Sequence, residues 1–195
     1  MMLGTLPTTL DVNGTTYKIK SDYRDILRIF SAFNDKELND NEKVYVLMKQ
    51  IYVDMEHIPA ADYQAAYDTA VTFIECHFKE DRPSPKTIDW DKDEQLFFPA
   101  INKVAGFEIR AVKYLHWWTF LGYFQGVDRD DTWGFILTIR QKKAKHKKLE
   151  QYEREFYDAN RSMCDIGTQG NSVEATEDAL LSIYNDLVKG GADNG

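Results

Sequence analysis

Apolar residues stand at alternate positions in two short segments near the start of the chain, and then change to a helical spacing. The two segments, residues 8–12 and 15–19, flank the dipeptide Asn13-Gly14. An Asn-Gly pair favours positive φ at both central positions of a type I′ turn, which connects a tight hairpin. We therefore predict a β-hairpin over residues 1–20. It should pack against the helices that follow, because an isolated hairpin is only marginally stable in water.

From Ser21 onward apolar residues recur every three or four positions, which is typical of amphipathic helices. Side chains suited to helix caps precede several of these stretches, and Gly106 is suited to a C-terminal cap. Pro99 lies inside one predicted helix and should either kink it or divide it into two shorter ones. The predicted helices cover residues 21–33, 40–51, 59–78, 90–105, 108–124, 131–160 and 172–188.

The predicted fold class is all-α, as a single multi-helix domain of about six to seven helices with a small N-terminal β-hairpin and a long basic helix. The helical domain should cover residues 21–160. A Pro-containing polar stretch allows a subdomain break at residues 79–88. A separate C-terminal helix is expected within residues 171–190.

The predicted helix over residues 131–160 changes character along its length. It is apolar as far as Ile139, and between Arg140 and Lys148 Ala144 is the one apolar residue. A helix that is polar on all sides for two turns is expected to project from the core or to bridge to a partner. A solvated basic face, closed by ion pairs with downstream glutamates, is the alternative. The candidate partner-binding residues are Arg140, Lys142, Lys143, Lys145, Lys147, Lys148, Leu149, Tyr152 and Phe156.

An aromatic segment, residues 114–124, precedes this helix. Large aromatic side chains supply much of the burial energy of a core. We therefore expect Trp117, Trp118, Phe120 and Leu121 to be core residues. The two adjacent tryptophans point to different sides of a helix, so one of them could instead anchor an interface.

The 195 residues carry 24 Lys and Arg against 32 Asp and Glu, a formal net charge of −8. An acidic chain disfavours nucleic acid as a general partner, although the six basic residues between Arg140 and Lys148 keep phosphate contacts as an alternative. The two cysteines, Cys76 and Cys164, are far apart and are expected to be reduced thiols. Neither a secretory signal nor a run of about 18 apolar residues is present. We therefore expect a cytoplasmic protein that does not enter a membrane.

Three residue groups suggest chemistry, but none makes a convincing site. Cys76 and His77 are adjacent on a predicted helix and point about 100° apart, so the imidazole is poorly placed to act as base for the thiol. The acidic run at residues 89–94 lacks the glycine and the distal glutamate of a calcium loop. His116 beside two tryptophans suggests catalysis, but the sequence offers no convincing set of catalytic residues to go with it. No nucleotide-binding, zinc-protease or hydrolase motif occurs, so we expect neither an enzyme, nor a cofactor, nor a metal site.

Four segments, residues 100–106 (AINKVAG), 108–110 (EIR), 116–120 (HWWTF) and 139–149 (IRQKKAKHKKL), resemble the "gene product fifteen" family of long-tailed bacteriophages of Gram-positive hosts. The resemblance covers about residues 23–156. It implies a late phage protein similar to tail assembly chaperones, which act in the host cytoplasm. The implied partner is the tape-measure protein, together with the tail-tube protein, a companion chaperone and further copies of the chain itself.

Two other functions stay open at this point. A structural tail component, such as a completion or connector protein, would remain in the virion. A nucleic-acid-binding regulator would use the basic run and show DNA binding that weakens steeply with salt.

Overall fold

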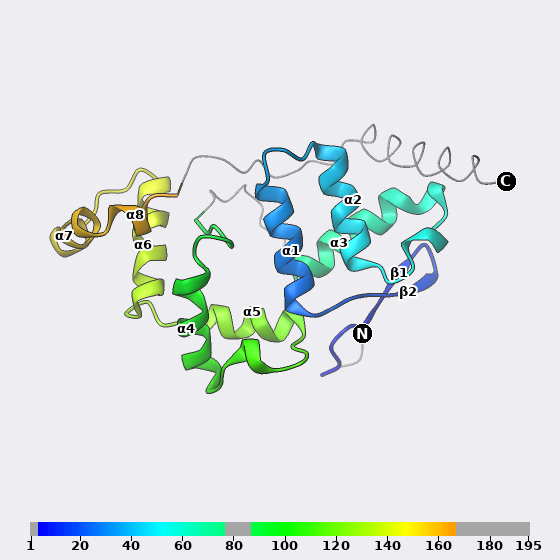
Figure 1. Cartoon of the computed structure of the whole chain (residues 1–195), viewed down its shortest axis with the longest axis horizontal. Coiled ribbons are helices and arrows are strands. Elements are labelled where there is room, and N and C mark those ends of the chain that lie inside the picture. Colours follow the sequence, from blue (N-terminus) through cyan, green and yellow to red (C-terminus); the bar gives the residue numbers. More distant parts are fainter. Residues whose placement is uncertain (1–3, 77–86, 167–195) are drawn as a thin grey trace. The chain divides into compact units, whose positions relative to one another are not determined.

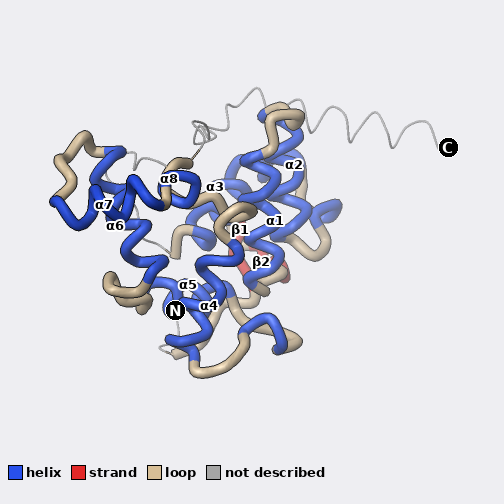
Figure 2. Tube along the Cα trace, turned by 60° about the vertical axis from the view of Figure 1, so that its left-hand side comes forward, coloured by secondary structure: helices blue, strands red, loops and turns tan. Residues whose placement is uncertain are grey.

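The computed structural model describes residues 4–76 and 87–166, which belong to two compact units (Figure 1). Helices make up most of both units, and a two-stranded hairpin is the sheet found in the described residues (Figure 2). The predicted all-α class with a small hairpin is therefore confirmed. The first unit contains the described residues 4–76, and the second contains the described residues 87–166. The helix predicted within residues 171–190 lies outside the described residues.

The first unit begins with the predicted hairpin, formed by β1 (Thr9–Val12) and β2 (Thr15–Lys18) in antiparallel register. Asn13 and Gly14 both have positive φ, 50° and 86°, as the type I′ turn requires. The Asn13 amide also donates a 2.7 Å hydrogen bond to Asp62, which ties the turn to a later segment of the same unit.

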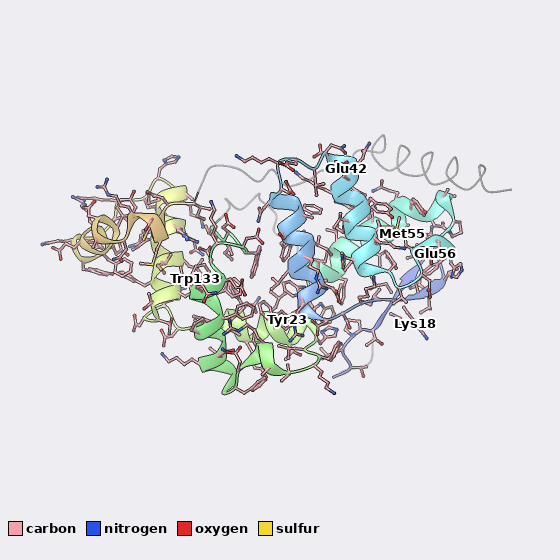
Figure 3. The ribbon with its side chains drawn as sticks, in the orientation of Figure 1. Lys18, Tyr23, Glu42, Met55, Glu56 and Trp133 are labelled. Carbon is pink, nitrogen blue, oxygen red and sulfur yellow. The ribbon has the colours of Figure 1, made fainter. Side chains whose placement is uncertain are left out.

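Three helices complete the first unit: α1 (Tyr23–Asn34), α2 (Asp40–Ile51) and α3 (Tyr63–Ile74). Two short 3-10 turns, Met55–His57 and Ala60–Asp62, connect α2 to α3. Apolar side chains of helical spacing form the core between these elements, and Tyr23, labelled in Figure 3, is 1% exposed. Other core residues of this unit include Ile26, Ile29, Val44, Met48, Ile51, Tyr52, Ala66, Ala70 and Phe73.

The second unit contains five α-helices and a 3-10 turn, Ile109–Ala111. The helices are α4 (Glu94–Ala105), α5 (Trp117–Gln125), α6 (Thr132–Ala144), α7 (Gln151–Ala159) and α8 (Arg161–Cys164).

The predictions for α4 and α5 have different outcomes. Of the two alternatives predicted at Pro99, division into two helices is not found: α4 continues past this exposed residue, while Phe97, Phe98 and Ile101 remain buried in the core. The helix predicted over residues 108–124 begins instead at Trp117, because the buried His116 side chain caps it by accepting a 3.0 Å hydrogen bond from the Trp118 amide.

An aromatic cluster forms the core of the second unit. Trp117 and Phe120 of α5 are fully buried and stack with their ring centroids 5.6 Å apart. Trp133 of α6, labelled in Figure 3, is also buried, and its ring centroid lies 6.3 Å from that of Phe97 of α4. Trp118 and Leu121 are half-buried.

The predicted helix over residues 131–160 is not continuous, and this correction matters most for function. The helix α6 ends at Ala144, and α7 begins only at Gln151. Two hydrogen bonds close the end of α6: the His146 amide donates to the Lys143 carbonyl at 3.0 Å, and the Lys147 amide to the Lys142 carbonyl at 2.8 Å. This is the pattern of a Schellman motif, with His146 in the left-handed conformation at φ 52°.

The start of α7 is fixed by a second local signal. Glu150 and Glu153 form a reciprocal capping box, in which each side chain accepts from the backbone amide of the other residue. The basic run is therefore divided between the last turns of a helix and a connecting loop.

Candidate partner-binding surface

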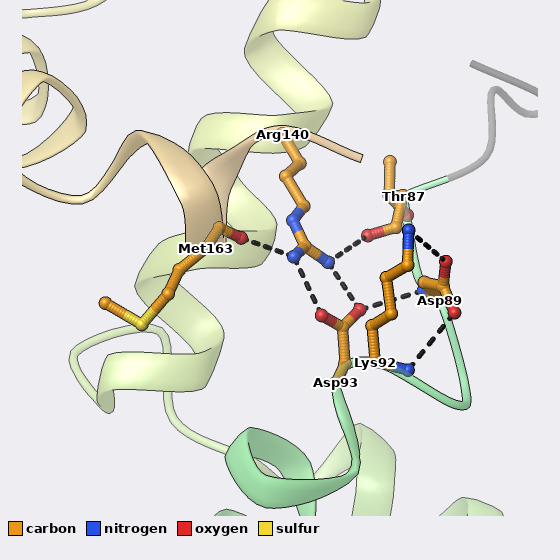
Figure 4. Close-up of polar contacts among 6 residues, drawn as sticks. All are labelled: Thr87, Asp89, Lys92, Asp93, Arg140 and Met163. Atoms are coloured by element: carbon orange, nitrogen blue, oxygen red, sulfur yellow. Dashed lines mark hydrogen bonds and ion pairs between the residues drawn. The ribbon is translucent and has the colours of Figure 1, made fainter. Parts of the chain in front are cut away.

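Arg140, the first of the predicted partner-binding residues, is 5% exposed and makes an internal ion pair (Figure 4). Its guanidinium donates to both carboxylate oxygens of Asp93, at 2.6 and 2.8 Å, and to the Thr87 and Met163 carbonyls. Asp93 is equally buried and also accepts a 2.8 Å hydrogen bond from the Asp89 amide. The pair thus joins α6 to the segment before α4 and to α8. Arg140 is not available to a partner, so that prediction was wrong.

The surroundings of Arg140 explain why it is retained in the interior. Its guanidinium carbon lies 5.4 Å from the centroid of the Trp133 ring, so the charge faces an aromatic surface as well as a carboxylate. A planar guanidinium can bind a carboxylate through two parallel hydrogen bonds, which a lysine cannot do. Removing either partner would leave an uncompensated charge in the core.

Lys142 is also directed toward another side chain of the same unit. Its ammonium donates to both oxygens of Glu153 on α7, at 2.6 and 2.7 Å. The Glu153 side chain is 1% exposed, and although burial acts to raise its pKa, the hydrogen bonds from Lys142 and from the Glu150 amide lower that pKa. The hydrogen bond to Glu153 raises the pKa of Lys142. This contact holds α6 against α7.

Lys143 makes the third internal contact of the basic run. Its ammonium donates to the Tyr157 hydroxyl at 2.6 Å and pairs with Asp165 beyond α8. Burial lowers the pKa of Lys143, but the hydrogen bonds to Asp165 and Tyr157 outweigh it, and the net shift is upward. Asp165 also accepts from the Tyr157 hydroxyl at 3.1 Å, so three polar side chains form one network.

The remaining three lysines, Lys145, Lys147 and Lys148, have a different environment. All are exposed, and their ammonium groups form no hydrogen bond or ion pair with another described residue. Arg154 on α7 is exposed in the same way. The predicted basic surface is thus reduced to the loop after α6 and the exposed side of α7.

The three predicted apolar partner-binding residues, Leu149, Tyr152 and Phe156, also differ in their exposure. Phe156 is half-buried and packs edge to face against Phe135 of α6, with centroids 5.0 Å apart. Tyr152 stacks on the other part of the same ring at 5.9 Å, yet 60% of it is exposed, the highest value among the large hydrophobic residues described. Leu149 is half-buried. Tyr152 is therefore the one of the three with most area left for a partner.

Sequence reasoning missed the internal partners of the basic run. Arg140 was not paired with Asp93, which is its counter-ion in the structure. Glu153 was considered only as a surface ion-pair partner at helical spacing, whereas its contact with Lys142 joins two helices. The signal that could have revealed this was the Glu150–Glu153 spacing of a capping box, which indicates a new helix.

The two cysteines and the possible metal ligands were also compared with the structure. Burial raises the pKa of the Cys76 thiol to about 11 and also raises the pKa of Cys164. Among residues 4–76 and 87–166, no three His, Cys, Asp or Glu side chains gather in a way that could hold a metal ion. In the same ranges, no helix has the length and apolar character needed to cross a bilayer.

In a comparison with protein families, the model described as "Bacteriophage Gp15 protein" matches residues 2–165 of the 195. Every residue of the loop and helices described above lies inside this match. No curated protein matched significantly, and no solved structure did.

Proposed function

The chain belongs to the bacteriophage Gp15 protein family, a family of phage structural or tail-related proteins, and from this premise we propose that it is a tail assembly chaperone. In this role it binds the tape-measure protein of the same phage in the host cytoplasm, keeps it soluble and assists the tail-tube subunits that polymerise around it. The proposed action is binding, with no catalytic step and no cofactor.

The observation that carries this proposal is the exposed ring of Tyr152. An aromatic residue that is 60% exposed and stacks on Phe135 offers apolar area to a partner. A chaperone for a long helical client needs such area to cover the apolar stripes of the client. The half-buried Leu149 and Phe156 extend this area and support the ring.

The polar residues of the same region favour binding over catalysis. The groups with the most elaborate contacts, Arg140 with Asp93 and Lys142 with Glu153, act on one another within the fold. The exposed lysines add solubility and charge contacts around Tyr152 without forming an acid–base pair.

Co-expression with the tape-measure protein of the same phage tests the proposal. We expect the soluble yield of the client to rise several-fold and the two proteins to co-purify. Tyr152→Ser should reduce both, whereas Tyr45→Ser, a matched change at a tyrosine of the first unit that is 39% exposed, should leave them unchanged. Phe156→Ser is unsuitable as the main test, because it removes a packing contact and would disturb the fold.

Two outcomes would contradict the proposal. A client that stays insoluble and unbound in the presence of this chain would exclude the chaperone role. Abundant peptides of this chain in purified virions, measured by mass spectrometry, would instead indicate a structural tail component.

A further inference from the structure

A cluster of positive charge without internal partners lies in the connection between α6 and α7. We call Lys145, Lys147 and Lys148 the basic loop; all three are exposed and adjoin the exposed His146. The Schellman end of α6 places them outside the helix, where their ammonium groups have no helical neighbours one turn away.

The acidic residues that follow the basic loop are already engaged. Glu150 accepts from the backbone in the capping box, and Glu153 is buried against Lys142. Glu155 accepts a 3.0 Å hydrogen bond from Gln151. Within the described part of the second unit, no carboxylate therefore forms an ion pair with the basic loop.

A segment of opposite charge connects α1 to α2 in the first unit. We call Asp35, Glu37 and Asp40 the acidic loop; all three are exposed, and with the exposed Lys36 between them residues 35–40 carry a net charge of −2. Glu42, labelled in Figure 3 at the start of α2, adds a fourth exposed carboxylate, although it also accepts from the Asn39 amide in a capping box.

The side chains of the acidic loop are only partly used by the backbone. Asp35 accepts a 2.8 Å hydrogen bond from the Glu37 amide, whereas Glu37 and Asp40 form no side-chain hydrogen bond or ion pair with another described residue. Across the described residues the first unit has seven Lys and Arg against twelve Asp and Glu, and the second has thirteen of each. The two loops are thus local concentrations of opposite charge on two different units.

We infer that the basic loop of one copy of this chain binds the acidic loop of a second copy. Charge complementarity between two named, exposed segments selects this occupant. A nucleic-acid duplex fits less well, because the acidic first unit of the same chain would repel its phosphates.

The two contacting surfaces are different, so the contact is heterologous. Such a contact leaves one basic and one acidic loop unused at the two ends, and further copies can add in a row. A string of copies would match a long client, but the inference concerns this chain alone and does not depend on the chaperone role.

The test is the mass of the purified full-length protein as a function of protein concentration and salt. At ~20 mM salt we expect the mean mass to rise with concentration above that of the monomer. At ~0.5 M salt, where screening acts over roughly 4 Å, the protein should return to the monomer.

Two charge-reversal variants locate the contact. Changing all three basic-loop lysines to Glu, or all three acidic-loop carboxylates to Lys, should each give a monomer at ~20 mM salt, with association weakened at least tenfold. An equal mixture of the two variants should associate again, because the two intact loops are complementary in charge and so are the two reversed loops.

A control variant reverses three exposed basic residues elsewhere, Lys18→Glu, Lys113→Glu and Arg129→Glu, and should associate as the wild type does. Circular dichroism and thermal melting check that every variant is folded. A wild-type protein that is monomeric at all salt concentrations overturns the inference. So does a mixture of the two variants that fails to associate, or a basic-loop variant whose one lost property is binding to duplex DNA.

Discussion

Two neighbouring groups of basic residues in this molecule have opposite environments. Arg140, Lys142 and Lys143 lie on α6 and are bound to carboxylates of their own unit, with Arg140 fully buried. Lys145, Lys147 and Lys148, only a few residues later, are exposed and their ammonium groups have no such partners. Charge content is the same in both groups, so composition does not explain the difference.

The end of α6 at Ala144 does explain it. Residues 140, 142 and 143 are on the last turn and a half of a helix that faces α7, α8 and the segment before α4, where carboxylates are within reach. After His146 the backbone turns, and the same side-chain types point away from these carboxylates. The position of the helix end therefore places the first group in internal contacts and leaves the second group exposed.

The largest effect should come from the buried group. Arg140→Met should lower the free energy of unfolding by about 3–5 kcal/mol, because Asp93 would remain charged in the core without a partner. Urea unfolding followed by circular dichroism measures this. Arg140→Met combined with Asp93→Leu should recover much of the loss, because neither charge is then buried. If Arg140→Met is as stable as the wild type, the buried group does not stabilise the fold and does not differ from the exposed group in this respect.

A smaller effect is expected at Lys142, through its partner. Glu153→Gln should cost roughly 1–2 kcal/mol at pH 7, since it replaces a buried charged hydrogen-bond acceptor by a neutral one.

The contribution of Glu153 also depends on pH. Its pKa is lower in the folded protein than in the unfolded chain, so its stabilisation is fully present above about pH 4.3 and is lost as the pH falls through the lowered folded value. Urea unfolding at pH 7 and pH 3 should show a larger loss on acidification for wild type than for Glu153→Gln. Equal losses would indicate that the contact with Lys142 contributes nothing.

The turn at His146 offers a substitution that should raise the free energy of unfolding. His146→Gly should stabilise the protein by about 0.5–1 kcal/mol, because glycine adopts the left-handed conformation without a Cβ penalty. The matched change Lys147→Gly, one residue later, should give no such gain. Chemical denaturation of both variants compares them directly.

The smallest effect on stability is expected from the exposed group. Changing Lys145, Lys147 and Lys148 together to Gln should alter the unfolding free energy by no more than about 0.5 kcal/mol, since exposed charges without partners contribute little. Thermal melting at low salt measures this. A loss comparable to that of Arg140→Met would show that the basic loop also has an internal role.

Local patterns predicted much of the fold. Asn13-Gly14 fixed the hairpin because the dihedral angles of its turn suit few other residue pairs, and apolar periodicity located α1, α2 and α3. The burial of Trp117 and Phe120 agrees with their expected place in the core. These features depend on residues close together in the chain.

The prediction of one long helix over residues 131–160 failed for a physical reason. Helices usually end at a glycine in the left-handed conformation, and this one ends at His146, so the usual signal is absent. The capping box at Glu150 uses glutamate in place of the common Ser or Thr. The Arg140–Asp93 pair joins residues 47 positions apart, and only the tertiary fold brings them together.

The turn at His146 has a consequence for how a partner can vary. On a helix, lysines would be held at fixed steps of about 100°, and a partner would need carboxylates at a matching interval. Lys147 and Lys148 instead follow a turn, and each can swing on its long side chain toward carboxylates at uneven intervals. The contact proposed for the basic loop would therefore accept an acidic segment in which single carboxylates are gained, lost or shifted.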